Sequence, residues 1–185
     1  MRVIAGSFRG RKLKSPKGLA TRPVLARVRE ALFNILGDIA GFSVLDLYAG
    51  TGAIGIEALS RGAGTLILVE SGYMQCRLIH ENLNLFGKEA VVIHSSVLPA
   101  LKRLRSEGAV FDFIFADPPY EKGLAQQTIA AVFNEKILAP DGIMAVTVRR
   151  TEELPHDEPG YELFVNRCYG DTRLALYRLQ CRGDG

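Results

Sequence analysis

The chain has 185 residues, of which 48% are hydrophobic and 23% are charged, a composition typical of a globular protein with a sizeable core. It has no apolar run near the roughly 20 residues that a membrane span needs, and no apolar stretch of about 7–15 residues follows the basic N-terminus, so we expect no membrane span and no secretory signal. Three cysteines without a CxxC pair argue against a disulfide framework and favour a cytoplasmic location. The three histidines are scattered, and we expect no metal site.

Positive charge is concentrated at the N-terminus. Residues 1–30 contain nine Lys or Arg and one acid, a net charge of +8, whereas residues 31–185 have a net charge of −5. A basic segment beside an acidic body suits contact with a phosphate backbone. A solvated basic tail is the alternative that charge alone leaves open.

The first 37 residues predict a small N-terminal unit. Two short strands, Val3–Ala5 and Lys12–Lys14, flank a glycine-bearing turn. A helix then begins at Pro23, with apolar residues at helical spacing, and ends near Gly37.

After Gly41 short apolar runs alternate with helical stretches, which predicts a parallel sheet covered on both faces. The expected strands are Ser43–Leu47, Thr65–Val69, Ala90–His94, Phe111–Ala116 and Ile143–Val148. The expected helices are Ile54–Ser60, Tyr73–Phe86, Leu98–Leu104 and Leu124–Asn134.

The C-terminal part lacks the alternation with helices. Leu163–Tyr169 and Arg173–Leu179 predict two strands joined at Gly170-Asp171, an antiparallel hairpin at one edge of the sheet. The expected fold is therefore α/β, a Rossmann-like sheet of parallel strands with a C-terminal antiparallel hairpin. We expect a basic extension over residues 1–37 and one larger domain over residues 38–185, with ligands at the C-terminal ends of the strands.

A glycine-rich loop follows the first parallel strand. Gly50, Gly52 and Gly55 form a GxGxxG between a predicted strand and a predicted helix, which is the context that a nucleotide-binding loop requires. Glu70, at the end of the next strand, is placed to accept hydrogen bonds from ribose hydroxyls. The loop alone is equally consistent with NAD. Asp46, four residues before the first glycine, favours a ligand with an ammonium group or a hydroxyl.

The fourth predicted strand ends in the tetrad Asp117-Pro118-Pro119-Tyr120. The prolines remove two N–H donors, so the Asp117 and Pro118 carbonyls are free to accept hydrogen bonds. A carboxylate, a carbonyl and an aromatic ring held together form a receptor for a planar amine. Asp117 and the Pro118 carbonyl would each accept one N–H, and Tyr120 would stack on the ring.

In combination, these motifs resemble the class I S-adenosylmethionine-dependent methyltransferases that modify exocyclic amino groups, over Ser43 to about Val148. The resemblance implies a catalytic role for the tetrad and assigns Glu70 to the ribose of S-adenosylmethionine. Ser96, after the third strand, stands where many relatives place an Asp or Asn that contacts adenine. The methionine part would be held by Asp46 and the loop residues Tyr48, Ala49, Gly50, Thr51 and Gly52.

The whole chain looks more specifically like the RsmD family, which methylates N2 of one guanine in small-subunit (16S) ribosomal RNA. The matching segments are Val3-Ile4-Ala5-Gly6, Arg9-Gly10-Arg11-Lys12-Leu13, Arg22-Pro23, Arg27 to Asn34, Glu57 to Ala63, and Tyr169-Gly170-Asp171-Thr172. The chain departs from the family at Val24-Leu25-Ala26, where relatives have Thr and a small polar or acidic run.

The resemblance implies a cytoplasmic enzyme whose partner is 16S ribosomal RNA within a small-subunit particle, and no feature demands more than a monomer. The expected RNA contacts are Arg9, Arg11, Lys12, Arg22 and Arg27.

Other interpretations remain open at this point. An adenine-N6 nucleic-acid methyltransferase would use the same tetrad, although 185 residues leave little room for DNA target recognition. A glutamine or protein amine target leaves the basic segment unexplained. An NAD-dependent oxidoreductase needs a hydride-handling acid or base that the sequence does not indicate. A non-catalytic RNA-binding module would leave the tetrad without a role.

Overall fold

The computed structural model describes residues 1–15, 23–120 and 123–180, which build one eight-stranded sheet in the order β3-β2-β1-β4-β5-β8-β7-β6. The first five strands run parallel, and β8, β7 and β6 continue the sheet with antiparallel pairing. The strands are β1 Ser43–Leu47, β2 Thr65–Glu70, β3 Val91–His94, β4 Phe111–Ala116, β5 Leu138–Arg149, β6 Asp157–Glu158, β7 Tyr161–Tyr169 and β8 Thr172–Leu179. The expected fold class is confirmed.

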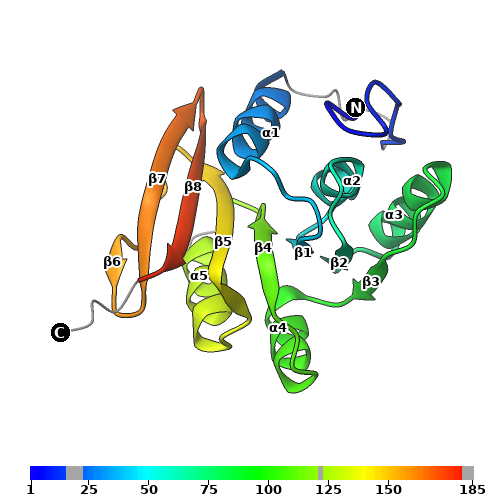
Figure 1. The fold of residues 1–185 in the computed structure, drawn as a ribbon. Coiled ribbons are helices and arrows are strands. Elements are labelled where there is room, and N and C mark those ends of the chain that lie inside the picture. The colour runs from blue at the N-terminus through cyan, green and yellow to red at the C-terminus, as the bar shows by residue number, and fades with distance from the viewer. Residues whose placement is uncertain (16–22, 121–122, 181–185) are drawn as a thin grey trace.

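Helices cover both faces of the sheet (Figure 1). One apolar cluster joins α4 and α5 to the sheet, and a second joins α1, α2 and α3 to the opposite face. The helices are α1 Pro23–Leu36, α2 Ala53–Ser60, α3 Tyr73–Leu85, α4 Val97–Ser106 and α5 Leu124–Asn134. No helix within the described part of the chain is long and apolar enough to cross a membrane.

Three differences from the sequence prediction go beyond one or two residues at the end of an element. Strand β5 begins at Leu138, five residues early, because a bulge in its pairing with β4 accommodates the Pro140-Asp141-Gly142 segment that reads as a turn. The two expected N-terminal strands are reduced to one isolated bridge, between Arg2 and Lys12. Strand β6 was not expected, since two residues carry no periodicity.

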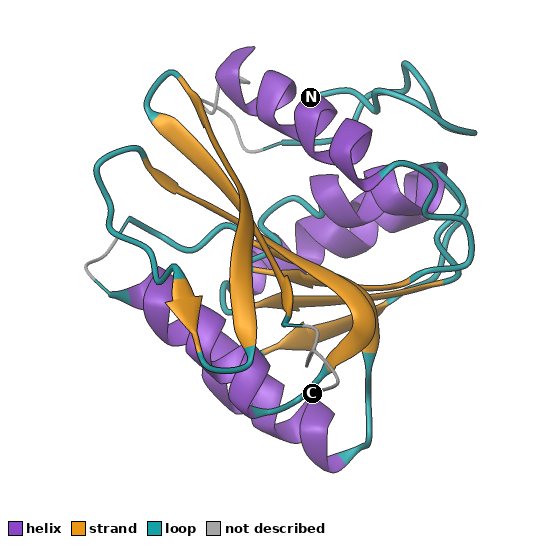
Figure 2. Cartoon of the chain, turned by 60° about the vertical axis from the view of Figure 1, so that its left-hand side comes forward, coloured by secondary structure: helices purple, strands orange, loops and turns teal. Residues whose placement is uncertain are grey.

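The C-terminal hairpin lies at the edge of the sheet, as expected, with β8 rather than β7 next to β5. Arg149 at the end of β5 pairs with Thr172 at the start of β8. The Gly170-Asp171 turn therefore lies at the edge where the parallel strands end, and β7 and β8 run past α1 there (Figure 2).

The N-terminal segment (residues 1–15) packs against the rest of the described chain and is not a solvated tail. Val3, Phe8 and Leu13 are buried in the cluster that contains α1, α2 and α3. Phe8 packs against Phe86, with 5.0 Å between the ring centroids. Asn82 holds the end of the segment, because its side chain accepts from the Lys14 N–H and donates to the Lys14 carbonyl.

Helix α2 provides the anchor for this segment. The fully buried carboxylate of Glu57 accepts hydrogen bonds from the backbone N–H groups of Ile4 and Ala5, at 2.8 and 2.9 Å. The Ser60 hydroxyl donates to the Ala5 carbonyl and accepts from the Phe8 N–H. The N-terminal segment, α1 and the sheet therefore share one core. The domain boundary expected at residue 37 stays a prediction.

Gly6 and Gly10 provide a matched pair for testing this docking. Both glycines have positive φ, +80° at Gly6 and +79° at Gly10. A Cβ at Gly6 would lie 1.8 Å from the Ser60 carbonyl oxygen, whereas a Cβ at Gly10 would have no atom within 4 Å outside its own and the adjacent residues. We expect Gly10→Ala to cost about 1 kcal/mol of unfolding free energy from its backbone conformation. Gly6→Ala adds overpacking of about 1–3 kcal/mol.

The measurement is denaturant unfolding of both variants, with amide hydrogen exchange at Val3 and Leu13 to detect local release of the segment. Equal stability and equal protection in the two variants would contradict the docked arrangement.

Candidate active site

The site lies where β1 and β4 end side by side. The chain order in the sheet reverses between these two strands, the position at which open α/β sheets bind ligands. Asp46 in β1 is paired with Phe115 in β4, and the Asp117 N–H points to the Leu47 carbonyl at 3.5 Å. This register brings the two predicted carboxylates, Asp46 and Asp117, to one edge of the sheet.

Asp46 is a buried carboxylate. It is 1% exposed, and one of its oxygens accepts a hydrogen bond from the Gly55 N–H at 3.0 Å. Burial raises the pKa of Asp46 to about 8, the Gly55 bond opposes the shift, and the nearby Asp117 and Glu70 carboxylates add to it. A ligand that brings positive charge to this position would relieve the cost of ionising Asp46.

The glycine loop is closed by Glu70. One Glu70 oxygen accepts the Gly50 N–H and the other accepts the Gly72 N–H, both at 2.8 Å. Gly50 and Gly52 have φ of +57° and +73°, which glycine adopts without strain. Glu70 is half-buried at the end of β2, and its carboxylate keeps lone pairs for a ligand hydroxyl.

Tyr48 is strained and tethered. Its φ is +57°, rare for a residue with a side chain, and its hydroxyl lies 2.8 Å from the Thr128 hydroxyl of α5. Burial raises the pKa of Tyr48. The tether fixes the ring between two cavities, because Tyr48 lines both.

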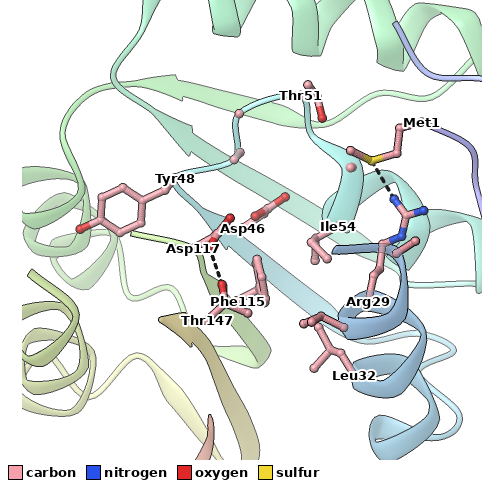
Figure 3. Close-up of a pocket in the computed structure, with 15 residues that line it drawn as sticks. Met1, Arg29, Leu32, Asp46, Tyr48, Thr51, Ile54, Phe115, Asp117 and Thr147 are labelled. Carbon is pink, nitrogen blue, oxygen red and sulfur yellow. Dashed lines mark hydrogen bonds between the residues drawn. The ribbon is translucent and has the colours of Figure 1, made fainter. Parts of the chain in front are cut away.

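The first cavity, of about 180 Å³, lies between α1, the glycine loop and the ends of β1, β4 and β5 (Figure 3). Its polar lining includes Arg29, Asp46, Thr51, Asp117 and Thr147. The second cavity, of about 300 Å³, is lined by Tyr48, Ser71, Ser96, Val97, Pro119 and Leu124. Ligand sites commonly occupy roughly 300–1,000 Å³, so an extended ligand would need both cavities and would pass Tyr48.

The tetrad occupies the end of β4. Asp117 is accessible, yet the protein packed around its carboxylate raises the pKa of Asp117, and a 2.5 Å hydrogen bond from the Thr147 hydroxyl opposes this shift. Pro118 is buried, so the backbone that carries its carbonyl is held firmly. Tyr120 is 42% exposed, and the Arg149 guanidinium lies 5.0 Å from its ring centroid.

The residues expected to contact RNA differ in their exposure and in their contacts within the protein. Arg9, Lys12 and Arg27 are exposed, and no ion pair joins them to another described residue. Arg11 is engaged within the protein, because it donates to the Leu85 carbonyl and its guanidinium lies 4.5 Å from the Phe86 ring centroid. Arg22 and the side chains of the Val24-Leu25 departure lie outside the described residues.

Three site residues were missed by the sequence analysis: Arg29, Thr128 and Thr147. Thr147 lies next to Asp117 because the β4–β5 register pairs Ala116 with Val146 and so places the next residues together. No local sequence signal marks Thr147, Arg29 or Thr128 as a site residue. Arg29 and Thr128 reach the site through the packing of α1 and α5.

Comparison with known proteins places the chain in a family. The family model described as Conserved hypothetical protein 95 matches residues 1–178. Ribosomal RNA small subunit methyltransferase D of Escherichia coli K12 is 33% identical over 186 residues, covering 100% of this chain and 92% of that protein. The Haemophilus influenzae protein of the same name is 32% identical, covering 96% and 93%.

Solved structures give the same result. The E. coli protein YhhF superimposes with a TM-score of 0.85 and 32% identity, over 98% of this chain and 99% of that one. The Thermus thermophilus 16S rRNA N2 G1207 methyltransferase RsmC, solved with AdoMet and guanosine, has a TM-score of 0.70 over 89% of this chain and 45% of its own; at 24% identity it supports the fold alone. The chain belongs to the Conserved hypothetical protein 95 family, the RsmD family of small-subunit ribosomal RNA methyltransferases within the class I methyltransferase fold.

Proposed function

We propose that this protein methylates the exocyclic N2 amine of a guanine in 16S ribosomal RNA, with S-adenosylmethionine as the methyl donor. The observation that carries the proposal is the position of Asp117. Its carboxylate, oriented by Thr147, stands one strand away from Asp46 and the glycine loop, at the edge where the strands end. Membership of the RsmD family supports the same reaction.

The described residues fit the cofactor. Asp46 is a buried carboxylate without a cationic partner among the described residues, as the ammonium of a methionine group requires. Glu70 is placed for the ribose hydroxyls, and the second cavity, next to Ser96, would take adenine. The Tyr48–Gly52 loop would pass between them. When bound, S-adenosylmethionine supplies a methyl group on a positively charged sulfur.

The chain's own residues would prepare the amine. The Asp117 carboxylate and the Pro118 carbonyl each accept one N–H of the guanine N2 group, which turns the nitrogen lone pair toward the methyl group. Tyr120 stacks on the base after the base leaves its own stack. The nitrogen would gain the methyl group as the carbon–sulfur bond breaks and the sulfur leaves as a neutral thioether; the nitrogen would then be positive and would lose one proton. Asp117, with its raised pKa, is placed to accept that proton.

The exposed Arg9, Lys12 and Arg27 would contact RNA phosphates, which supply affinity but little sequence information. We infer a small-subunit particle as the substrate, a monomeric enzyme and, from the location of that substrate, the cytoplasm.

Transfer of labelled methyl from S-adenosylmethionine to small ribosomal subunits that lack the modification, followed by nucleoside analysis, tests the reaction. We expect N2-methylguanosine. N6-methyladenosine would instead identify an adenine methyltransferase. Absence of label on RNA, with cofactor binding intact, would contradict an RNA substrate and direct the search to DNA or protein amines.

Asp117→Ala should lower kcat by about 10²–10³-fold, because the amine loses its orienting acceptor and its proton acceptor. Binding of S-adenosylhomocysteine, measured by calorimetry, should change little. Near-normal turnover with intact cofactor binding would contradict the mechanism.

Thr147→Val is a milder variant that tests the same carboxylate. It keeps the Asp117 carboxylate but removes the hydrogen bond that lowers its pKa. The pKa of Asp117 then rises, and the acid limb of the kcat/KM profile should move to higher pH. An unchanged pH profile would show that Asp117 ionisation does not limit the reaction.

Cofactor affinity should depend on pH through Asp46. Because its pKa is raised to about 8, the free protein must release a proton below that pH to pair with an ammonium group. We expect the affinity for S-adenosylhomocysteine to increase by up to about tenfold per unit as pH rises toward 8. Calorimetry across this range should show the slope in the natural protein and its loss in Asp46→Asn. A slope that survives the substitution would assign it to another group.

A further inference from the structure

Two arginines share one buried carboxylate beneath the N-terminal segment. The Arg61 Nε lies 3.0 Å from a Glu57 oxygen, and the Arg29 Nε lies 3.8 Å from the other. Glu57 also accepts two backbone N–H groups, so its oxygens are fully engaged. The group of three therefore keeps one excess positive charge inside the protein.

That excess charge is poorly neutralised at Arg29. The side chain is only 6% exposed, and its Nε has no hydrogen-bond partner among the described residues. Its Nη1 donates to the Met1 sulfur at 3.0 Å, a weak acceptor, and its Nη2 donates to the Arg2 carbonyl at 2.5 Å. Burial lowers the pKa of Arg29, and the Glu57 carboxylate opposes this shift. Both groups that accept hydrogen bonds from this buried guanidinium are uncharged, so a bound anion would stabilise its charge.

Arg29 lines the first cavity together with Asp46 (Figure 3). One cavity therefore has a buried cation in its α1 wall and a buried carboxylate at the end of β1. An amino acid group, with a carboxylate and an ammonium on the same carbon, matches this pair of charges. RNA phosphates are an unsuitable match, because Arg29 is buried and an anion can reach it only by entering the cavity.

We propose that Arg29 binds the carboxylate of the methionine part of S-adenosylmethionine, opposite the ammonium that Asp46 binds. The inference rests on the proposed function and adds a cofactor-binding residue from α1. It also gives the docked N-terminal segment a role at the site, since Met1 and Arg2 hold the Arg29 guanidinium in place.

Arg61 provides a matched control. It pairs with the same Glu57 carboxylate, yet its guanidinium lies 4.6 Å from the Phe33 ring centroid, and it does not line the first cavity. Arg61→Gln therefore perturbs the same buried ion group without removing a cavity donor. Thermal unfolding of Arg29→Gln and Arg61→Gln would show how much each change costs the fold.

The test is calorimetric binding of three ligands to each protein: S-adenosylhomocysteine, its decarboxylated analogue, and 5′-methylthioadenosine, which lacks the whole amino acid group. The natural protein and Arg61→Gln should bind S-adenosylhomocysteine about 10–100-fold more tightly than the decarboxylated analogue, the range for a charge-assisted hydrogen bond. Arg29→Gln should lose this preference and keep its affinity for 5′-methylthioadenosine.

A preference that persists in Arg29→Gln, or that is absent from the natural protein, would overturn the inference. If Arg29→Gln does not fold, Arg29→Lys keeps the charge without the planar donor pair and should still weaken the preference; an unchanged preference in that variant would also overturn it. Failure of the natural protein to bind any of the three ligands would contradict the proposed function instead.

Discussion

The parallel pairing of β1 with β4 is the constraint on which the site depends. Because the chain order reverses at this pair, the helices that follow the two strands, α2 and α5, pack on opposite faces of the sheet and leave a crevice at the strand ends. The register of the β1–β4 pairing then decides which side chains meet, because it brings Asp46 and Asp117 to the same edge from segments about seventy residues apart in the sequence. Shifting β4 by one residue would turn Asp117 to the opposite face of the sheet.

A second organising contact is the buried Glu57 carboxylate. It joins the N-terminal segment, α1 and α2 in one place, through backbone N–H groups on one side and arginines on the other. These four partners offset the cost of burying the Glu57 carboxylate. The basic segment is thereby part of the cavity wall, while Arg9 and Lys12 remain on its outer surface.

The site gathers three carboxyl groups at the ends of β1, β2 and β4, and Arg29 of α1 lines the same cavity as Asp46 and Asp117. Asp46, Glu70 and Asp117 lie close enough that the pKa of Asp46 is raised by the other two in addition to burial. Each has a different environment: Asp46 is buried, Glu70 is bonded to two backbone amides, and Asp117 is bonded to Thr147. These environments allow neighbouring carboxylates to serve separate roles in binding and catalysis.

The parallel strands, the C-terminal hairpin, the helices, the glycine loop and the Asp117-Pro118-Pro119-Tyr120 tetrad were predictable from the sequence, because each occupies a short stretch with its own periodicity or turn chemistry. The two N-terminal strands were wrong and β6 was not predicted. Strand β5 was placed too short, since Pro140 and Gly142 indicate a turn that tertiary pairing overrides. The positions of Thr147 beside Asp117, of Arg29 in the cavity that Asp46 also lines and of Arg11 against Phe86 were decided only in three dimensions. Each pair depends on strand register or helix packing between distant segments, and local sequence patterns contain no record of either.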